Sequence, residues 1–294
     1  MLLKDLLLST EIVDSIGNLE TNITGIAIDS RRVRPGFLFV AVKGTQTDGH
    51  AFVDKAIENG AAALVVCEAV NAPKASAVVR VSDTEKLVGL IATRFYGDPS
   101  HKLRLVGVTG TNGKTTVATV LYQLYRGLGY KVGLVSTVCN YIDDRTVEAT
   151  HTTPDPIELN ALLAEMVEAG CDYAFMECSS HAIHQHRIGG LHFEGALFTN
   201  LTRDHLDYHG TFENYRNAKK MFFDDLSKSS FAVTNADDKN GMIMVQNCAG
   251  NVKTYSTRAA ADFKGRIIEE SIEGMLLEID GREVSVPFVG RFNV

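Results

Sequence analysis

The stretch Thr109-Gly110-Thr111-Asn112-Gly113-Lys114-Thr115-Thr116 decides the fold of this 294-residue chain. It follows a short apolar run, 103–108, and precedes an amphipathic stretch, 117–128. A strand, a glycine-rich turn and a helix in this order form a phosphate-binding loop, because N–H groups at the start of the helix attract anions. In such a loop Lys114 reaches the β- and γ-phosphates, and a threonine hydroxyl binds Mg²⁺. The sequence therefore predicts a site for ATP, or another nucleoside triphosphate, with Mg²⁺.

The loop departs from the general pattern G-x-x-x-x-G-K-[ST] at one position. That pattern requires glycine where this chain has Val108, and the nearest glycines are Gly107 and Gly110. A glycine-rich turn followed by a surface lysine is the plain alternative. We favour phosphate binding, because the strand, the loop, the Lys-Thr pair and the helix all agree.

The composition indicates a soluble globular protein of two domains. The chain is longer than one typical domain, and its 45% hydrophobic and 22% charged residues are ordinary values. The net charge of −7 and the lack of a basic run argue against nucleic-acid binding. No stretch reaches the ~18–20 apolar residues of a membrane span, and residues 1–8 predict a short amphipathic helix instead of a signal peptide.

The cysteines point to a reducing compartment. Their number is odd and no C-x-x-C occurs, so we expect reduced thiols in a cytoplasmic protein. The five residues are Cys67, Cys139, Cys171, Cys178 and Cys248.

Strand-like and helix-like patterns alternate in the first part of the chain. Strands are expected at 25–28, 37–42, 62–66 and 77–81, and helices at 52–59 and 84–96. Gly97-Asp98-Pro99-Ser100 is the expected boundary between an N-terminal domain, 1–98, and a second domain, 101–294.

The alternation becomes more regular in the second domain. Strands are expected at 103–108, 131–136, 173–177, 194–199 and 230–234, and helices at 115–128, 156–169 and 211–226. Repeated β-α-β units predict an α/β fold with a mostly parallel sheet, whose ligands lie outside the carboxyl ends of the strands. The stretches 109–116, 177–181 and 199–209 should converge there. A β-rich run, 284–289, ends the chain without a closing helix, so we expect this domain to be incomplete at its C-terminus.

Glu177 ends one of the expected strands and is followed by Cys178-Ser179-Ser180-His181. A carboxylate at a strand end beside a phosphate loop suits Mg²⁺, which binds carboxylate and phosphate oxygens. A glutamate that caps a helix or lies on the surface is the alternative. Two polar strand ends that point the same way favour the metal ligand.

The stretch 200–209 carries two histidines after another strand. His205 and His209 are four residues apart, which would place them on one helical face. The spacing resembles a zinc site, but the glutamate of H-E-x-x-H is missing. We therefore expect a histidine that binds or orients near Mg²⁺ and phosphate, and not zinc.

The helix expected at 211–226 contains two neighbouring lysines. Tyr215, Lys219, Phe222 and Leu226 share one face, whereas Lys220 falls on the polar side. A lysine on an apolar face is costly unless it is paired or neutralised. Its ammonium either reaches the surface along its stem, or Lys219 is buried and modified by CO₂ to a carbamate, an anionic metal ligand.

Two further polar stretches lie near the strand ends. In His181-Ala182-Ile183-His184-Gln185-His186-Arg187 we expect Gln185 and Arg187 to contact an anionic substrate, because arginine matches carboxylates. His151-Thr152-Thr153-Pro154-Asp155-Pro156 leads into a helix, and its hydroxyls could bind substrate or cap that helix. The pattern alone leaves both roles open.

Together these residues resemble the Mur ligases over essentially the whole chain. Asp29-Ser30-Arg31-Arg32-Val33-Arg34-Pro35-Gly36 and Asp48-Gly49-His50 are similar to that family's UDP-binding domain. Gly110-Thr111-Asn112-Gly113-Lys114-Thr115-Thr116 matches the family's ATP loop, which accounts for the departure at Val108. Other stretches close to the family's forms are Thr152-Thr153-Pro154-Asp155, Glu177-Cys178-Ser179-Ser180-His181 and Arg203-Asp204-His205-Leu206-Asp207-Tyr208-His209.

The resemblance implies an ATP-dependent acid–amino-acid ligase of peptidoglycan precursor synthesis. ATP would phosphorylate the γ-carboxylate of D-Glu in UDP-N-acetylmuramoyl-L-alanyl-D-glutamate. The amine of meso-diaminopimelate or L-lysine would then attack the acyl phosphate. The resemblance also implies a cytoplasmic monomer that needs ATP and Mg²⁺ and has no nucleic-acid partner.

The resemblance further implies roles for individual residues. ATP would be bound by Gly110, Thr111, Asn112, Gly113, Lys114, Thr115 and Thr116. Thr115 and Glu177 would hold one Mg²⁺, and His205 with carbamylated Lys219 would support a second. The catalytic residues would be Lys114, Glu177, His205 and Lys219. Ser30 would contact the uridine part, and the muramoyl-dipeptide would be positioned by Thr152, Thr153, Ser179, Gln185 and Arg187.

Family members continue past residue 294 into a helix and a third domain that carries the amino-acid pocket. We therefore expect this chain alone to be a poor or inactive catalyst that still binds nucleotide or UDP-substrate. A folylpolyglutamate synthetase-like ligase is one alternative, although it should lack a first domain with Asp29-Ser30-Arg31. A non-catalytic fragment that binds substrate without turnover is another. A P-loop kinase or GTPase is a third alternative, of which the GTPase is disfavoured, because Asn235-Ala236-Asp237-Asp238 does not match N-K-x-D.

Overall fold

The structure is a computed structural model that describes residues 1–44, 47–72 and 74–291. The chain divides into two compact units. The first unit comprises Met1–Lys102, Pro154–Glu168 and Gln185–Leu191, and the second comprises Leu103–Thr153, Ala169–His184 and His192–Val294. The step at 102–103 falls close to the expected boundary at 98–101. The last three residues of the expected domain 101–294 lie outside the described residues.

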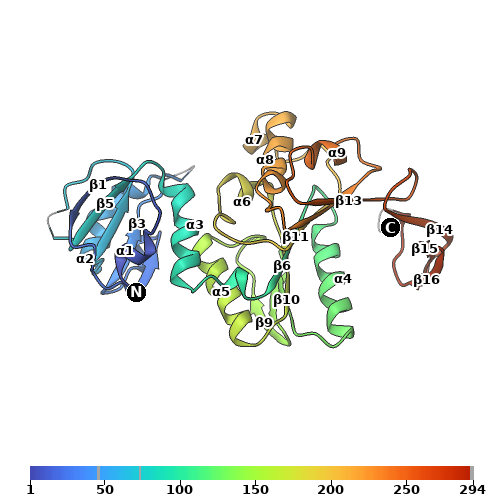
Figure 1. The fold of residues 1–294 in the computed structure, drawn as a ribbon, viewed down its shortest axis with the longest axis horizontal. Coiled ribbons are helices and arrows are strands. Elements are labelled where there is room, and N and C mark those ends of the chain that lie inside the picture. Colours follow the sequence, from blue (N-terminus) through green and yellow to red (C-terminus); the bar gives the residue numbers. More distant parts are fainter. Residues whose placement is uncertain (45–46, 73, 292–294) are drawn as a thin grey trace. The chain divides into compact units, whose positions relative to one another are not determined.

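A five-stranded sheet in the order β1-β5-β4-β3-β2 forms the centre of the first unit (Figure 1). Its parallel strands are β2 (Gly25–Ala27), β3 (Phe37–Val40), β4 (Ala63–Val66) and β5 (Ala77–Val81), all within the ranges that the sequence predicted. β1 (Ile12–Gly17) pairs antiparallel with β5 at the sheet edge. It was not predicted, because its mainly exposed residues show no regular apolar alternation.

The helices of the first unit cover both faces of this sheet. Two apolar cores result: one joins Leu3, Leu6 and Ile91 to Leu38 and Val40, and the other joins helix α2 to the opposite face. The helices are α1 (Leu3–Leu6), α2 (Val53–Glu58), α3 (Thr84–Phe95) and α5 (Pro156–Glu168), with short 3-10 turns η1 (Ser30–Arg32), η2 (Gly49–Phe52) and η3 (Pro99–His101). The helix expected at 1–8 is thus only one turn long, and α5 packs on α3 although it comes much later in the chain.

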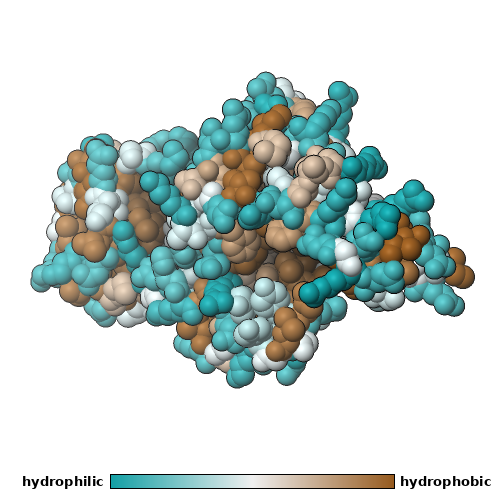
Figure 2. Space-filling view, turned by 45° about the vertical axis from the view of Figure 1, so that its right-hand side comes forward, coloured by the Kyte–Doolittle hydropathy of each residue, from teal (hydrophilic) through white to brown (hydrophobic). Residues whose placement is uncertain are grey.

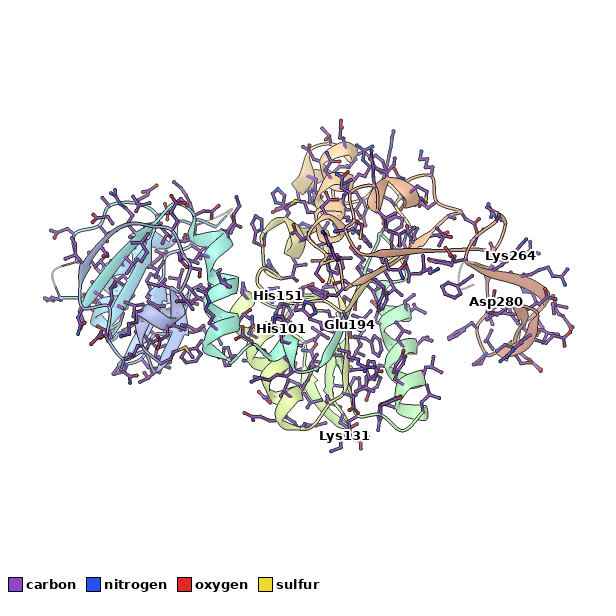
Figure 3. All side chains as sticks on the ribbon, in the orientation of Figure 1. His101, Lys131, His151, Glu194, Lys264 and Asp280 are labelled. Carbon is purple, nitrogen blue, oxygen red and sulfur yellow. The ribbon has the colours of Figure 1, made fainter. Side chains whose placement is uncertain are left out.

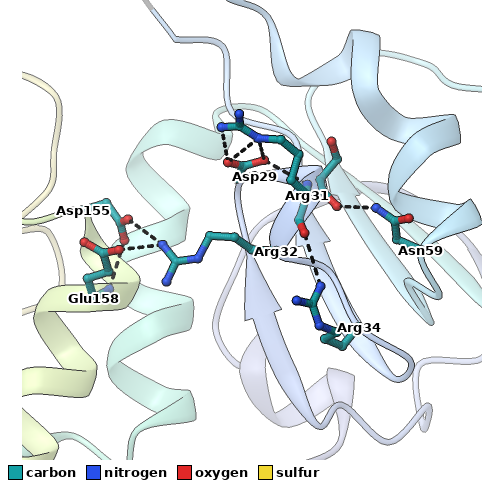
Figure 4. Close-up of polar contacts among 8 residues, drawn as sticks. Asp29, Arg31, Arg32, Arg34, Asn59, Asp155 and Glu158 are labelled. Carbon is teal, nitrogen blue, oxygen red and sulfur yellow. Dashed lines mark hydrogen bonds and ion pairs between the residues drawn. The ribbon is translucent and has the colours of Figure 1, made fainter.

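Arg32 ties α5 to the N-terminal part of the first unit (Figure 4). Its Nη1 lies 2.6 Å from Glu158 Oε1 and 3.9 Å from Asp155 Oδ2. Asp155 also accepts N–H bonds from Ile157 and Glu158, and so caps α5. Burial raises the pKa of Asp155. These bonds account for a helix that belongs to the first unit although the sequence order suggested the second.

An eleven-stranded sheet forms the second unit (Figure 1). Its parallel part contains, in spatial order, β7 (Val132–Val135), β10 (Tyr173–Glu177), β6 (Arg104–Thr109), β11 (Gly195–Phe198), β12 (Phe231–Asn235) and β13 (Asn251–Ser256). The predicted mostly parallel sheet is confirmed. Because parallel strands end at the same edge, the residues that follow β6, β10 and β11 lie together.

The helices described in the second unit are α4 (Lys114–Gly127), α6 (Ser180–His184), α7 (Leu206–His209), α8 (Phe212–Asp224) and α9 (Gly241–Met244). Of these, α4 and α8 match the ranges expected at 115–128 and 211–226, whereas the short helices α6, α7 and α9 were not among the expected ranges. α4 buries Ala118 and Tyr122 against Val106, Val132 and Phe175 of the sheet. α8 begins at a Thr211 cap, whose hydroxyl accepts the Asn214 N–H.

Among the described residues, β13 and four strands at the ends of the large sheet were not predicted, and the fifth end strand, β16 (Arg282–Val286), was predicted only in part. β8 (Cys139–Ile142) and β9 (Arg145–Glu148) form a hairpin, and β14 (Phe263–Ser271), β15 (Gly274–Ile279) and β16 form an antiparallel meander. The β-rich run expected at 284–289 overlaps only the end of β16. Lys264 and Asp280, labelled in Figure 3, close β14 and β15 together, since the N–H of each bonds to an oxygen of the other.

The meander also exposes apolar side chains. Phe263, Ile268, Ile272 and Ile279 are 42–93% exposed, and brown spheres mark this end of the chain in Figure 2. All five cysteines are free thiols. Among the described residues, no helix has both the length and the apolar character needed to cross a bilayer.

Candidate active site

The loop between β6 and α4 has the shape of a phosphate-binding turn. Gly110 and Gly113 adopt φ of 149° and 85°, which residues with a side chain rarely adopt. A Cβ atom on Gly110 would overlap with Thr199 Oγ1, so only glycine fits there. α4 begins at Lys114, directly after the second glycine. The first N–H groups of α4 therefore lie at the strand ends, where they can bind an anion.

Two lysines share one carbonyl oxygen in this loop. Lys114 Nζ donates to Gly110 O at 3.0 Å and to Thr111 O at 2.8 Å, and Lys219 Nζ donates to Gly110 O at 2.8 Å. Lys219 is only 1% exposed, and its ammonium lies 4.9 Å from the centre of the Tyr215 ring. Burial lowers the pKa of both lysines, and the charge of Lys114 lowers that of Lys219 further. The apolar-face position predicted for Lys219 is confirmed, whereas Lys220 pairs with Asp224.

Glu177 lies beside the loop and is 1% exposed. Thr115 Oγ1 donates to Glu177 Oε2 at 2.9 Å, and the Thr137 N–H donates to Oε1 at 2.8 Å. A hydroxyl and a carboxylate oxygen are thus neighbours at the start of α4, and both are hard oxygen ligands. This pair fits Mg²⁺, whose remaining ligands would be water and phosphate oxygens.

The loop 152–153 is bound to the same strand end. Thr153 Oγ1 donates to Glu177 O at 2.8 Å and accepts the Ser179 N–H at 3.2 Å. Thr152 Oγ1 accepts from Thr137 Oγ1 at 3.1 Å. Thr137 was missed by the sequence analysis, because it binds Glu177 through its backbone N–H, a group that every residue except proline carries. The structure therefore brings Thr152, Thr153 and Ser179 together with the Glu177 site.

The segment that follows β11 forms hydrogen bonds with the phosphate loop. Thr111 N–H donates to Asn200 O, and Thr199 Oγ1 donates to Asn112 O at 2.7 Å. Asp238 in turn accepts the Leu201 N–H at 2.7 Å. The expected convergence of 109–116, 177–181 and 199–209 is therefore confirmed. Asn200 and Asp238 were not identified from the sequence, because they act on backbone groups far away in the chain.

Four histidines of the second unit gather in one aromatic cluster: His181, His184, His205 and His209. His205 does not share a helical face with His209, because it precedes α7 with φ of 51°; that prediction is wrong. Its ring lies 5.0 Å from His181 and 6.0 Å from Tyr215. His209 is buried and lies 3.0 Å from Ser180 Oγ, and burial lowers its pKa to about 4. In the described part of the chain, no three histidine, cysteine, aspartate or glutamate side chains form a metal-binding group.

Three of the predicted substrate residues lie in the first unit. Ser30 is 5% exposed at the start of η1, and its carbonyl accepts from Asn59 Nδ2 at 2.8 Å (Figure 4). Arg187 donates from two nitrogens to Gln185 Oε1, at 3.0 and 2.7 Å. The guanidinium of Arg187 thus binds the amide oxygen of Gln185 in this structure, and its expected contact with an anionic substrate stays a prediction.

The fold and this loop define an α/β protein with a glycine-rich turn of the phosphate-binding type at the strand ends. A family profile described as the Mur ligase middle domain matches residues 108–294, and one described as the Mur ligase family, catalytic domain, matches residues 22–96. The chain belongs to the Mur ligase family, as the resemblance of its motifs predicted.

The individual proteins that this chain resembles carry names more specific than that of the family. The UDP-N-acetylmuramoyl-L-alanyl-D-glutamate--2,6-diaminopimelate ligase of Phocaeicola vulgatus is 58% identical and covers 100% of this chain, which spans 61% of that relative's length. A solved structure with the same ligase name is 28% identical, with a TM-score of 0.84, and covers 100% of this chain and 61% of its own. A folylpolyglutamate synthase of Mycobacterium tuberculosis is 15% identical, with a TM-score of 0.54, and covers 69% of this chain and 54% of its own. The last likeness shows the fold alone.

Proposed function

We propose that this chain belongs to an ATP-dependent ligase that joins 2,6-diaminopimelate to UDP-N-acetylmuramoyl-L-alanyl-D-glutamate. The observation that carries the proposal is the pairing of Thr115 and Glu177 at a phosphate loop that is also bound by the half-buried Lys114 and the buried Lys219. The substrates come from the name of a relative at 58% identity that this chain matches along its full length.

The reaction activates a carboxylate by phosphorylation. The γ-carboxylate oxygen of D-Glu attacks the γ-phosphorus of ATP, and the bond to the β-phosphate breaks to release ADP. The amine of the diamino acid then attacks the acyl phosphate, loses a proton and displaces phosphate. Both partners of the first step are anions, so the site must supply positive charge and alignment.

Different residues would bind the nucleotide, the metal ion and the UDP-dipeptide. Lys114 supplies a cation at the β- and γ-phosphates, and the N–H groups of 113–115 hold the phosphate chain. Mg²⁺ at Thr115 and Glu177 would neutralise phosphate charge. Ser30, Gln185 and Arg187 in the first unit, and Thr152, Thr153 and Ser179 in the second, are proposed to hold the UDP-dipeptide.

Lys219 is proposed to act as a carbamate. Its lowered pKa favours the neutral amine, and the lone pair of that form would attack the carbon of CO₂. An N–C bond forms, one C–O electron pair moves to oxygen, and the nitrogen releases a proton to water. The anionic product, with His205, would support a second Mg²⁺.

The cytoplasmic location and the monomeric state also stay predictions.

The proposed binding of ATP together with Mg²⁺ is tested with Glu177→Gln. Calorimetric titration of ATP should show binding that Mg²⁺ strengthens in the unaltered chain, and the substitution should reduce that Mg²⁺ effect about tenfold or more, because one anionic ligand is lost. Glu194→Gln is the matched control, since Glu194 (labelled in Figure 3) is exposed and precedes β11 at the opposite strand end. An ATP affinity that is the same with and without Mg²⁺ in the unaltered chain would contradict the proposal.

A further inference from the structure

We propose that Asn200 is a positioning residue that holds the phosphate loop in the shape needed by the phosphates of a nucleotide. The inference rests on the nucleotide site of the proposed function. It concerns a residue outside the loop itself, which reaches the loop only through the fold.

The side-chain amide of Asn200 forms hydrogen bonds with both backbone polar groups of one loop residue, Asn112. The Asn112 N–H donates to Asn200 Oδ1 at 3.0 Å, and Asn200 Nδ2 donates to Asn112 O at 3.0 Å. The backbone of Asn200 adds a third bond, because its carbonyl accepts the Thr111 N–H at 2.8 Å. Thr199 Oγ1 donates to the same Asn112 carbonyl at 2.7 Å. Two loop residues are therefore held by four hydrogen bonds from two adjacent residues.

The loop needs such a clamp because of its own sequence. Thr111 and Asn112 lie between Gly110 and Gly113, both of which have positive φ. Glycine on each side leaves the segment with large conformational freedom, and ordering it opposes ligand binding. A clamp that fixes the segment before the nucleotide arrives removes that cost from binding.

The clamp also selects which donors face the phosphates. Both backbone polar groups of Asn112 are committed to Asn200, so Asn112 cannot turn its N–H to a ligand without breaking a bond. The N–H groups of 113–115, at the start of α4, are left for the phosphate chain. Asparagine suits this position, because one short side chain offers both a donor and an acceptor.

Aspartate is the sharpest substitution at this site. Asn200→Asp keeps the acceptor for the Asn112 N–H, but it sets a carboxylate oxygen against the Asn112 carbonyl and adds a negative charge near the phosphates. Asn200→Ala removes both bonds without adding charge. Asn251→Asp is the matched control: it makes the same chemical change at an exposed residue that begins β13, at the strand end away from the loop.

The experiment compares the binding of ADP and of adenosine to these chains. Relative to the unaltered chain, ADP affinity should fall about tenfold in Asn200→Ala and about a hundredfold in Asn200→Asp, as expected for one lost pair of bonds and for an added repulsion. Adenosine affinity should change less than about twofold, because adenosine has no phosphate. Asn251→Asp should bind both ligands as the unaltered chain does.

Each other outcome overturns the inference. Unchanged ADP affinity in the Asn200 variants means that the clamp does not shape the site, and equal losses for ADP and adenosine mean that it only maintains the fold. If the Asn200 variants do not fold, Thr199→Val removes one clamp donor with little change of shape, and unchanged ADP affinity there rejects the clamp. An unaltered chain that binds ADP no more tightly than adenosine is a different result, which rejects the proposed nucleotide site itself.

Discussion

Replacing Lys114 with methionine should reduce the affinity of the chain for Mg²⁺·ATP by roughly a hundredfold or more, because the phosphates lose a half-buried cation. Lys114 stands at the first turn of α4, and its ammonium donates to the Gly110 and Thr111 carbonyls. Burial lowers its pKa, so a phosphate anion nearby would favour the charged form strongly. Methionine keeps the length and the apolar packing of the stem but removes the charge.

Calorimetry or competition with a fluorescent nucleotide measures this change. Lys131→Met is the matched control, because Lys131 (labelled in Figure 3) precedes β7 at the opposite strand end and bonds to the Ala169 carbonyl. Its ATP affinity should equal that of the unaltered chain. If Lys114→Met bound ATP within about threefold of the unaltered chain, the lysine would not contact phosphate.

Lys219→Met should make the fold more stable at neutral pH while it removes the proposed carbamate. The folded chain lowers the pKa of Lys219 well below the ~10.4 of an unfolded chain. Between these two pKa values the unfolded chain binds a proton that the folded chain does not, so the free energy of unfolding rises with pH across this window. Stability is lost as the pH falls toward the folded pKa. Methionine has no titrating group, so the variant avoids the cost of burying a protonatable amine. Its free energy of unfolding near neutral pH should therefore be higher by roughly 1–4 kcal/mol.

At high pH the Lys219→Met variant should instead be less stable than the unaltered chain. Above ~10.4 the lysine is neutral in both states, and the variant then lacks only the bond to Gly110 O, about 1 kcal/mol. Urea unfolding of the second unit at both pH values measures the two effects. Lys220→Met is the control, since its partially exposed pair with Asp224 should contribute about 1 kcal/mol or less and create no such window.

The same variant tests the modification. In ¹³C-bicarbonate buffer the unaltered chain should give a carbamate carbonyl NMR signal that Lys219→Met lacks and Lys220→Met retains. A variant less stable than the unaltered chain at neutral pH would show that Lys219 is not buried as a neutral amine. A signal that survives in Lys219→Met would place the carbamate elsewhere.

Periodicity and local motifs predicted the parts of the site that depend on short stretches of chain. The loop was readable because a buried strand, two glycines, Lys114 and a helix follow one another. Lys219 was readable because Tyr215 and Phe222 mark the buried face of α8. Local sequence also predicted every parallel strand of the first unit, since these strands are continuous apolar runs.

Features that depend on distant contacts could not be predicted in this way. The sequence order placed α5 in the second domain, whereas the ion pair of Arg32 with Glu158, 126 residues apart, ties it to the first. His205 was misplaced because its left-handed backbone is a tertiary feature. The meander was missed because β14 is mostly exposed and lacks an apolar face. Asn200 was missed because its partners are backbone groups of the loop, 88 residues away.

Calorimetric titration with UDP-N-acetylmuramoyl-L-alanyl-D-glutamate tests the proposed function most directly. UDP-N-acetylmuramoyl-L-alanine, which lacks the D-Glu carboxylate, and a folate are the controls. The proposal predicts binding of the dipeptide form that is tighter than that of either control and is weakened by Arg187→Met. A folded chain that binds the dipeptide form no better than UDP-N-acetylmuramoyl-L-alanine, or that prefers the folate, would contradict the proposed ligase.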